Sequence, residues 1–157
     1  MKRSHLTQLT HFAGALLLAA VLPASAQNAS KADAISLADK AVANIQKKGV
    51  EEACKDFADP KGEYIRGELY VVVQDMQCKM VCHAVNPKMN GKDMLELKDA
   101  NGKKFTQQMR DIAATEKTGW VDYLWPNPVS KALEPKSAYV RRAGEKHMVS
   151  VGIYSQK

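Results

Sequence analysis

The chain has 157 residues and a formal net charge of +6 at pH 7. This length predicts a single domain that can bury a sizeable core. The lysines are spread along the sequence, so the charge can attract small anions but gives no footprint for nucleic acid.

The first residues have the three parts of a secretory signal. Two basic residues at 2–3 precede an apolar run at 12–22, and Ala-Ser-Ala at 24–26 supplies the small residues of a cleavage site. The run is too short to cross a bilayer, which takes about 20 apolar residues. We expect residues 1–26 to be a cleaved signal peptide. Residues 27–157 would then form one soluble periplasmic or secreted domain with a net charge of +4 and no membrane insertion. A retained membrane anchor is the alternative.

Two helices are predicted next. Apolar residues recur at spacings of three and four from Ile35 to Ile45, Ser30 can cap the start, and Gly49 interrupts the pattern. A second short helix has its apolar face within residues 50–57 and ends at Asp59-Pro60. Both apolar faces indicate core packing.

The rest of the chain is mainly strand. The segment 68–75 contains Leu-Tyr-Val-Val-Val, which is apolar without alternation and predicts a strand covered on both faces. Further elements are expected in this order: a strand at 79–85, a turn-rich segment at 86–102, a helix carrying Phe105, Met109, Ile112 and Ala113, and strands at 119–125, 137–143 and 147–154. Consecutive strands with the helices kept apart predict an α+β domain with an antiparallel sheet.

The order of several segments is familiar. "GELYVVVQD", a tight turn, "CHAVNPKMNGKDMLELKDANGKKF", "GWVDYLWPNP", "PKSAYV" and "VGIY" follow one another. Over residues 33–154 this series resembles the single Cache domain, an extracytoplasmic relative of the PAS fold. The resemblance implies a five-stranded antiparallel sheet with a long N-terminal helix packed across it. It also implies a small-ligand pocket on the other face of the sheet, enclosed by the loops between the second and third strands.

Domains of this kind sense short organic acids, amino acids or related metabolites, mostly as parts of membrane-bound chemoreceptors or histidine kinases. This chain departs from that arrangement, because residues 27–157 contain no membrane-length apolar stretch and no signalling module. The resemblance therefore implies ligand binding without direct signalling. An adaptor that reports to a membrane receptor or kinase is a further hypothesis.

Cys78, Cys82 and His83 offer a different interpretation. They form C-x-x-x-C-H, one residue longer than the C-x-x-C-H motif that attaches c-type haem. In an extended segment the two cysteine α-carbons would lie roughly 13 Å apart, too far for a disulfide between them. A c-type haem protein remains the alternative function, whereas a zinc site is weaker because no fourth ligand is evident.

The three cysteines allow at most one intramolecular pair. Either Cys54 pairs with Cys82, or the cysteines are separate buried thiols. In the family pattern the place of Cys78 is usually glycine, in a turn where a positive φ is convenient.

The hairpin around Gln77-Cys78 places candidate pocket residues. With a turn of two or four residues, Val72 pairs with His83 and Tyr70 with Val85, so Tyr70, Val72 and His83 share one face. A three-residue turn would change this parity. The resemblance puts a pocket histidine at His83, and a structural histidine is the alternative.

The next strand, "GWVDYLWP", directs Val121, Tyr123 and Trp125 to one face and Trp120 to the other. Tyr123 and Trp125 combine apolar rings with polar tips, which suits a small-molecule pocket. We expect Trp120 to lie beneath the N-terminal helix.

"PKSAYV" contains Lys136 and Tyr139, at a family position where a lysine begins the fourth strand. A buried lysine beside tyrosines would be a partner for a carboxylate, and a surface lysine is the alternative. Arg141 and Arg142 are expected in solvent, or one of them at the pocket entrance.

No pattern of catalytic residues is evident, so we do not expect an enzyme. The main hypothesis is a periplasmic domain that binds a carboxylate of two to four carbons. Its predicted ligand-binding residues are Tyr70, His83, Tyr123, Trp125, Lys136 and Tyr139.

Overall fold

A computed structural model describes residues 29–155, so the predicted signal peptide lies outside the described residues. The elements in chain order are α1 (Lys31–Lys48), α2 (Val50–Ala58), β1 (Ile65–Arg66), β2 (Leu69–Asp75), β3 (Met80–His83), the 3-10 helix η1 (Pro87–Met89), α3 (Phe105–Thr115), β4 (Thr118–Pro126), β5 (Leu133–Ala143) and β6 (His147–Tyr154). Between residues 29 and 155, none of the helices has the length and apolar character that crossing a membrane requires.

Local capping sets the bounds of the first two helices. The Ser30 hydroxyl accepts a hydrogen bond from the Asp33 backbone N at 3.2 Å, and the Asp33 carboxylate accepts one from the Ser30 backbone N at 2.8 Å. At the other end Gly49 has a φ of 82°, a conformation that favours glycine, and separates α1 from α2. Both predicted helices are confirmed.

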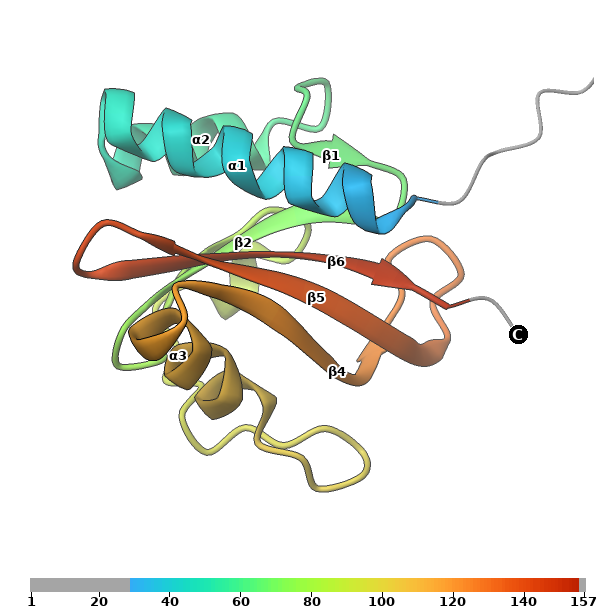
Figure 1. The fold of residues 1–157 in the computed structure, drawn as a ribbon. Helices are drawn as coiled ribbons and strands as arrows, with labels where there is room; N and C mark the ends of the chain where they lie inside the picture. The colour runs from blue at the N-terminus through green and yellow to red at the C-terminus, as the bar shows by residue number, and fades with distance from the viewer. Residues whose placement is uncertain (1–28, 156–157) are drawn as a thin grey trace, which may run out of the picture.

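All strand pairs are antiparallel, and the sheet has the order β1-β2-β6-β5-β4, with β3 also paired to β2. Helices α1 and α2 cover one face of the sheet, and α3 lies on the other (Figure 1). The α+β class is confirmed. The two-residue strand β1 makes the sheet six-stranded and was not predicted, because so short a segment has no pattern of its own.

The hairpin between β2 and β3 has a three-residue turn, not the predicted two or four. Cys78 N donates to Asp75 O at 3.0 Å, and Cys78 has a φ of 65°, the positive value expected where the family usually has glycine. A bulge between Val73 and Gln74 then shifts the register by one residue. Because the two shifts cancel, Val72 pairs with His83 as predicted. The predicted Tyr70–Val85 pair is wrong, since β3 ends at His83.

The hydrophobic core has two parts, one on each face of the sheet. Under α1 and α2, buried Leu37 and Phe57 pack with Val71 and Val149 of the central strands. Under α3, buried residues of the helix and of strands β4, β5 and β6 form the second part: Phe105, Met109, Val121, Val140 and Met148. Strand β2 is thus covered on both faces, as its apolar sequence predicts.

Candidate functional site

A cavity lies on the α3 face of the sheet, between the strands and the segment that joins β3 to α3. The cavity volume, measured as the space open to the centres of water-sized spheres, is about 20 Å³. All space between the lining atoms, including solvent at the mouth, amounts to about 320 Å³. One water needs about 10 to 15 Å³ by the first measure, so the cavity suits a ligand of few atoms. Side chains with a polar group in the lining are Tyr70, Gln74, His83, Thr106, Tyr123, Trp125 and Ser150.

Strand register brings these side chains together. Tyr70, Val72 and Gln74 alternate along β2 and so face the cavity. Val72 pairs with His83 on one side and with Ser150 of β6 on the other, so these three residues form one row across the floor. The predicted shared face of Tyr70, Val72 and His83 is confirmed.

His83 is buried, with 4% of its surface exposed. Its Nδ1 accepts a hydrogen bond from the Asn86 backbone N at 3.1 Å, so the neutral ring carries its proton on Nε2. Burial lowers the pKa of His83 to about 4, and the Lys136 charge adds to this. The imidazole is therefore neutral at pH 7 and offers one N–H donor.

Lys136 is buried, with 3% of its surface exposed, so the surface alternative is wrong. Its Nζ donates to the Tyr70 hydroxyl at 2.7 Å and lies 4.0 and 4.8 Å from the ring centroids of Tyr70 and Tyr154. Burial lowers the pKa of Lys136 to about 7, partly opposed by Glu68. Lys136 is not itself among the lining residues. It supports the cavity wall at Tyr70.

The stem of Lys136 passes directly over Gly152 of β6. A β-carbon added at Gly152 would lie 2.0 Å from the Lys136 Cε, so a larger residue would displace the lysine. A glycine inside a strand is consistent with close approach by another group. Gly152 is a positioning residue that the sequence interpretation missed.

Tyr70 and Tyr154 continue the hydrogen-bond chain away from Lys136. The two hydroxyl oxygens are 3.3 Å apart, and Tyr154 donates to the Pro126 carbonyl at 3.0 Å. With its proton used on Pro126, Tyr154 accepts from Tyr70, which itself accepts from Lys136. Burial raises the pKa of Tyr70 to about 12, so the hydroxyl stays protonated.

An aromatic group forms the wall beside Lys136. The Tyr123 ring stacks on Phe105 with centroids 4.1 Å apart, and Trp125 meets Phe105 edge to face at 5.4 Å. Tyr123 pairs with Lys136 across β4 and β5. Burial raises the pKa of Tyr123 well above its usual value, so its hydroxyl is a donor at neutral pH. Tyr123 and Trp125 both face the cavity, which is the shared orientation that strand alternation predicted.

Tyr139 does not line the cavity, contrary to the prediction. Its ring lies 5.3 Å from that of Trp120, which packs against the cluster under α1. Strand side chains alternate between faces, and three positions separate Lys136 from Tyr139, so they point in opposite directions. Arg141 forms an ion pair with Asp39 of α1 and therefore does not guard the cavity.

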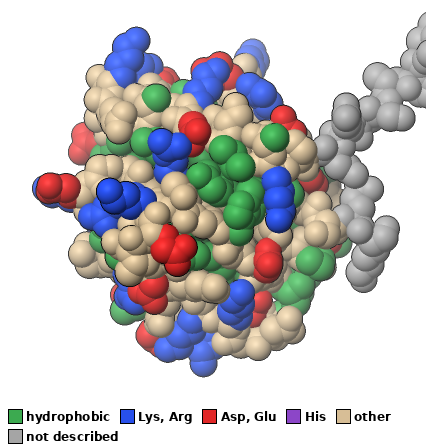
Figure 2. All heavy atoms as spheres, in the orientation of Figure 1, with side chains coloured by type: hydrophobic (Ala, Val, Ile, Leu, Met, Phe, Trp, Pro, Cys, Tyr) green, Lys and Arg blue, Asp and Glu red, His purple; other side chains and the backbone are tan. Residues whose placement is uncertain are grey.

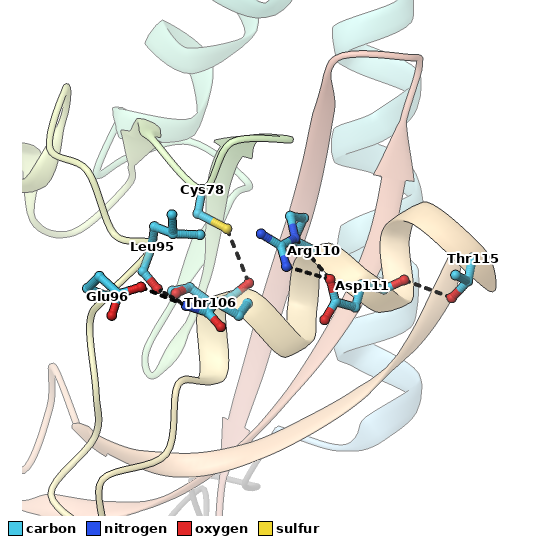
Figure 3. A network of polar contacts seen from close by, with 8 residues as sticks. Cys78, Leu95, Glu96, Thr106, Arg110, Asp111 and Thr115 are labelled. Carbon is cyan, nitrogen blue, oxygen red and sulfur yellow. Dashed lines mark hydrogen bonds and ion pairs between the residues drawn. The ribbon is translucent and has the colours of Figure 1, made fainter.

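The cysteines are arranged in a way that rules out the haem interpretation. Cys54 and Cys82 form a disulfide with α-carbons 6.0 Å apart, which leaves Cys82 without a thiol for haem attachment. Cys78 is buried on the α3 side, where its Sγ donates to the Thr106 carbonyl of α3 at 3.5 Å (Figure 3). The haem alternative is therefore wrong, and the Cys54–Cys82 alternative is confirmed.

Several lining residues had no signal strong enough for prediction. Gln74 Nε2 donates to the Cys78 carbonyl at 3.4 Å, and the Thr106 hydroxyl donates to the Met94 carbonyl at 2.5 Å. Ser150 is the one with a usable signal, since it is a polar residue in an apolar central strand. Side chains of the turn-rich segment, Met89, Met94 and Leu97, have no periodicity to place them.

Charged side chains outside the cavity are mixed in sign. Figure 2 shows Lys and Arg interspersed with Asp and Glu on the face drawn. Lys40 pairs with Glu63, and Lys48 with Asp56 at 2.6 Å. Such exposed ion pairs contribute little to stability. Lys136 differs from these lysines because it is buried, and it is therefore the cation that we consider as a partner for a ligand.

Comparison with known proteins gives consistent matches. The family model of single Cache domain 2 matches residues 3–156. The methyl-accepting chemotaxis protein McpP of Pseudomonas putida KT2440 is 29% identical over 72 residues, which is 46% of this chain. The match covers 13% of McpP.

Three solved structures share the fold. A periplasmic sensor domain of a chemotaxis protein has a TM-score of 0.63 at 26% identity, covering 78% of this chain and 88% of its own. A methyl-accepting chemotaxis protein from Vibrio parahaemolyticus RIMD 2210633 has a TM-score of 0.69 at 21% identity, covering 79% and 87%. A Cache chemosensory domain described for carboxylic acid recognition has a TM-score of 0.70 at 21% identity, covering 80% and 92%. At 21% identity the last two show the fold alone.

Proposed function

Because this chain belongs to the single Cache domain 2 family, we propose that it is a periplasmic ligand-binding domain for a short-chain organic acid of two to four carbons. The observation that carries the choice of ligand is the buried ammonium of Lys136. In residues 29–155 its Nζ forms no ion pair with a carboxylate. A buried charge is costly unless it is paired, so an anionic ligand is the partner that this site favours.

Neutral donors surround the position where the carboxylate would sit. The Tyr70 and His83 rings lie 5.1 Å apart, and Lys136, which does not itself line the cavity, donates to the Tyr70 hydroxyl. One ammonium proton is used on Tyr70, which leaves two for a ligand. On binding, the carboxylate would accept from Lys136 with help from the His83 Nε2–H and the Tyr123 hydroxyl, because the Tyr70 proton is already donated to Tyr154. Charge-assisted hydrogen bonds of this kind are the stronger ones.

A thermal-shift screen tests the proposal. Acids of two to four carbons, amino acids and purines are added separately to the purified domain, with sodium chloride at equal ionic strength as the control. A ligand at a hundredfold excess over its Kd stabilises the folded state by about 2.7 kcal/mol, which raises the Tm by several degrees. We expect a rise with at least one acid. No rise with any acid would refute the choice of ligand.

The proposal includes removal of residues 1–26 and location of the remainder in the periplasm. The positive start, short apolar run and Ala-Ser-Ala sequence support it, together with the similarity to a periplasmic sensor domain. The intact mass of the protein from the periplasmic fraction should correspond to a chain that begins near Gln27. A mass that includes residues 1–26 would favour a retained anchor.

A membrane receptor or kinase is the proposed recipient of the signal. The relatives named as chemotaxis proteins support this partner class. Recovery of such a receptor on the immobilised domain should require the acid found in the screen. Recovery that is equal with and without the acid would contradict an adaptor role.

A further inference from the structure

Methionines form much of the cavity wall. Met80, Met89, Met94 and Met109 line the cavity, and the whole chain has seven methionines. They come from four different segments: the start of β3, η1, the loop before α3, and α3 itself. Met80, Met94 and Met109 are buried, and Met89 is half-buried.

The register of β2 separates a polar end of the cavity from this methionine wall. Tyr70, beside Lys136, marks one end, and the row of Val72, His83 and Ser150 comes next. Gln74, two residues further on, pairs with Met80. From Tyr70 to Gln74 the strand spans roughly 13 Å. A carboxylate at the Lys136 end would therefore direct its other end toward the methionines.

The methionine wall has no group for a second charge. Of the cavity-lining residues, all of which lie in the described part of the chain, none is Asp, Glu, Lys or Arg. A second carboxylate would lie among thioethers and the apolar side chain of Leu97 without a cation, and an α-ammonium would have no carboxylate partner. Burial of an unpaired charge is strongly unfavourable.

Methionine differs from the other apolar residues that build a pocket. Its side chain is unbranched, has three rotatable bonds and carries a polarisable sulfur, so it adjusts to ligands of different shape. The cavity itself is small. Side chains of this kind can turn aside for an added methylene group, whereas branched residues would collide with it.

We propose that Met80, Met89, Met94 and Met109 form an adjustable wall that determines the chain length of the acid, so that the site takes monocarboxylates with an uncharged alkyl tail. This inference rests on the proposed function, because it assumes that the carboxylate binds at the Lys136 end. Burial of one methylene group increases affinity about fourfold. Affinity therefore rises from acetate to propanoate to butanoate. The rise ends at the chain length for which the methionine side chains can no longer move aside.

Calorimetric titration of the whole domain with acetate, propanoate, butanoate, pentanoate, succinate and alanine tests this inference. In the parent we expect succinate and alanine to bind at least a hundredfold more weakly than butanoate. Met94→Ala removes a loop side chain from the wall and should shift the ratio of pentanoate to propanoate affinity by about tenfold in favour of pentanoate. Met76→Ala, which truncates a half-buried methionine that does not line the cavity, is the matched control and should leave the ratio within about threefold of the parent.

Met89→Ala is a second variant in case Met94→Ala folds poorly, since Met89 is only half-buried. A shift toward pentanoate in either alanine variant supports the wall. If the parent binds the acids but neither folded variant changes the ratio, the wall is refuted and the proposed function stands. Succinate binding as tight as butanoate would also refute it. If no acid binds the parent, the proposed function fails first.

Discussion

Lys136→Met is the substitution that tests the site most directly. Methionine keeps much of the stem that crosses Gly152 and removes the ammonium that donates to Tyr70. A charge-assisted hydrogen bond contributes about 1.5 to 3 kcal/mol, so affinity for the acid should fall by about ten- to a hundredfold. Isothermal titration calorimetry of parent and variant measures the difference.

Stability should behave differently from affinity. Burial lowers the pKa of Lys136 from 10.5 to about 7. At about 1.4 kcal/mol per pKa unit, keeping this lysine charged in the ligand-free fold costs on the order of 5 kcal/mol. The cost is fully present below pH 7 and disappears as the pH rises toward 10.5. Lys136→Met removes the cost of the buried charge but also loses the hydrogen bond to Tyr70. The Tm of the variant at pH 6 should therefore equal or exceed that of the parent.

A matched control separates the site from the general loss of charge. Lys98 is exposed beside the lining residue Leu97, and Lys98→Met removes the same charge without entering the cavity. The control should bind the acid within about twofold of the parent, since exposed charges contribute little. If Lys136→Met binds as tightly as this control, Lys136 is not the partner of the carboxylate, and His83 becomes the candidate.

Three further predictions follow from the same geometry. Affinity for the acid should be constant below about pH 6 and fall about tenfold per pH unit above pH 7, because the free protein must take up a proton at Lys136 to bind the acid. Calorimetric titration in buffers of different ionisation enthalpy measures this proton uptake. An affinity that stays constant from pH 6 to 9 would count against the prediction. Gly152→Ala should lower affinity at least tenfold, because the added β-carbon meets the Lys136 stem; binding by this variant as tight as by the parent in calorimetry would contradict the positioning role. Replacing Cys54 and Cys82 by alanine together should lower the free energy of unfolding by about 3 to 4 kcal/mol, as expected for a cross-link that spans 28 residues, and urea denaturation with no change in midpoint would refute this.

Elements controlled by local chemistry could be predicted from the sequence. Ser30 and Gly49 mark the limits of α1 because capping and positive φ depend on the residue itself. The apolar run of β2 predicted burial on both faces because no other arrangement covers it. Each of these features requires only neighbouring residues.

The hairpin shows where local prediction ends. Cys78 adopts a positive φ that the residue type does not favour, so the turn length could not be read from composition. The compensating bulge between Val73 and Gln74 depends on packing of both strands. The correct pairing of Val72 with His83 therefore resulted from two opposite shifts of one residue.

Contacts between segments far apart in the chain could not be predicted from the periodicity of the sequence. The disulfide requires α2 to lie against β3, a distance that no local pattern encodes, and the sequence left its pairing open. Met89 of η1 and Met94 of the loop that follows reach the cavity through tertiary packing alone. The Tyr139 error was of another kind, because alternation from Lys136 already places the two on opposite faces.

Gly152 joins these two kinds of information. A glycine in the middle of the apolar strand β6 carries a local signal, since it weakens the strand and indicates close approach of another group. What approaches it is decided by register: Gly152 pairs with Ala138, two residues along β5 from Lys136 and on the same face. The lysine stem can cross to Tyr70 only where no β-carbon stands in its path. Gly152 thus weakens strand β6, but it leaves the space in which the stem of Lys136 reaches Tyr70. The proposed acid requires the ammonium of Lys136 at that position.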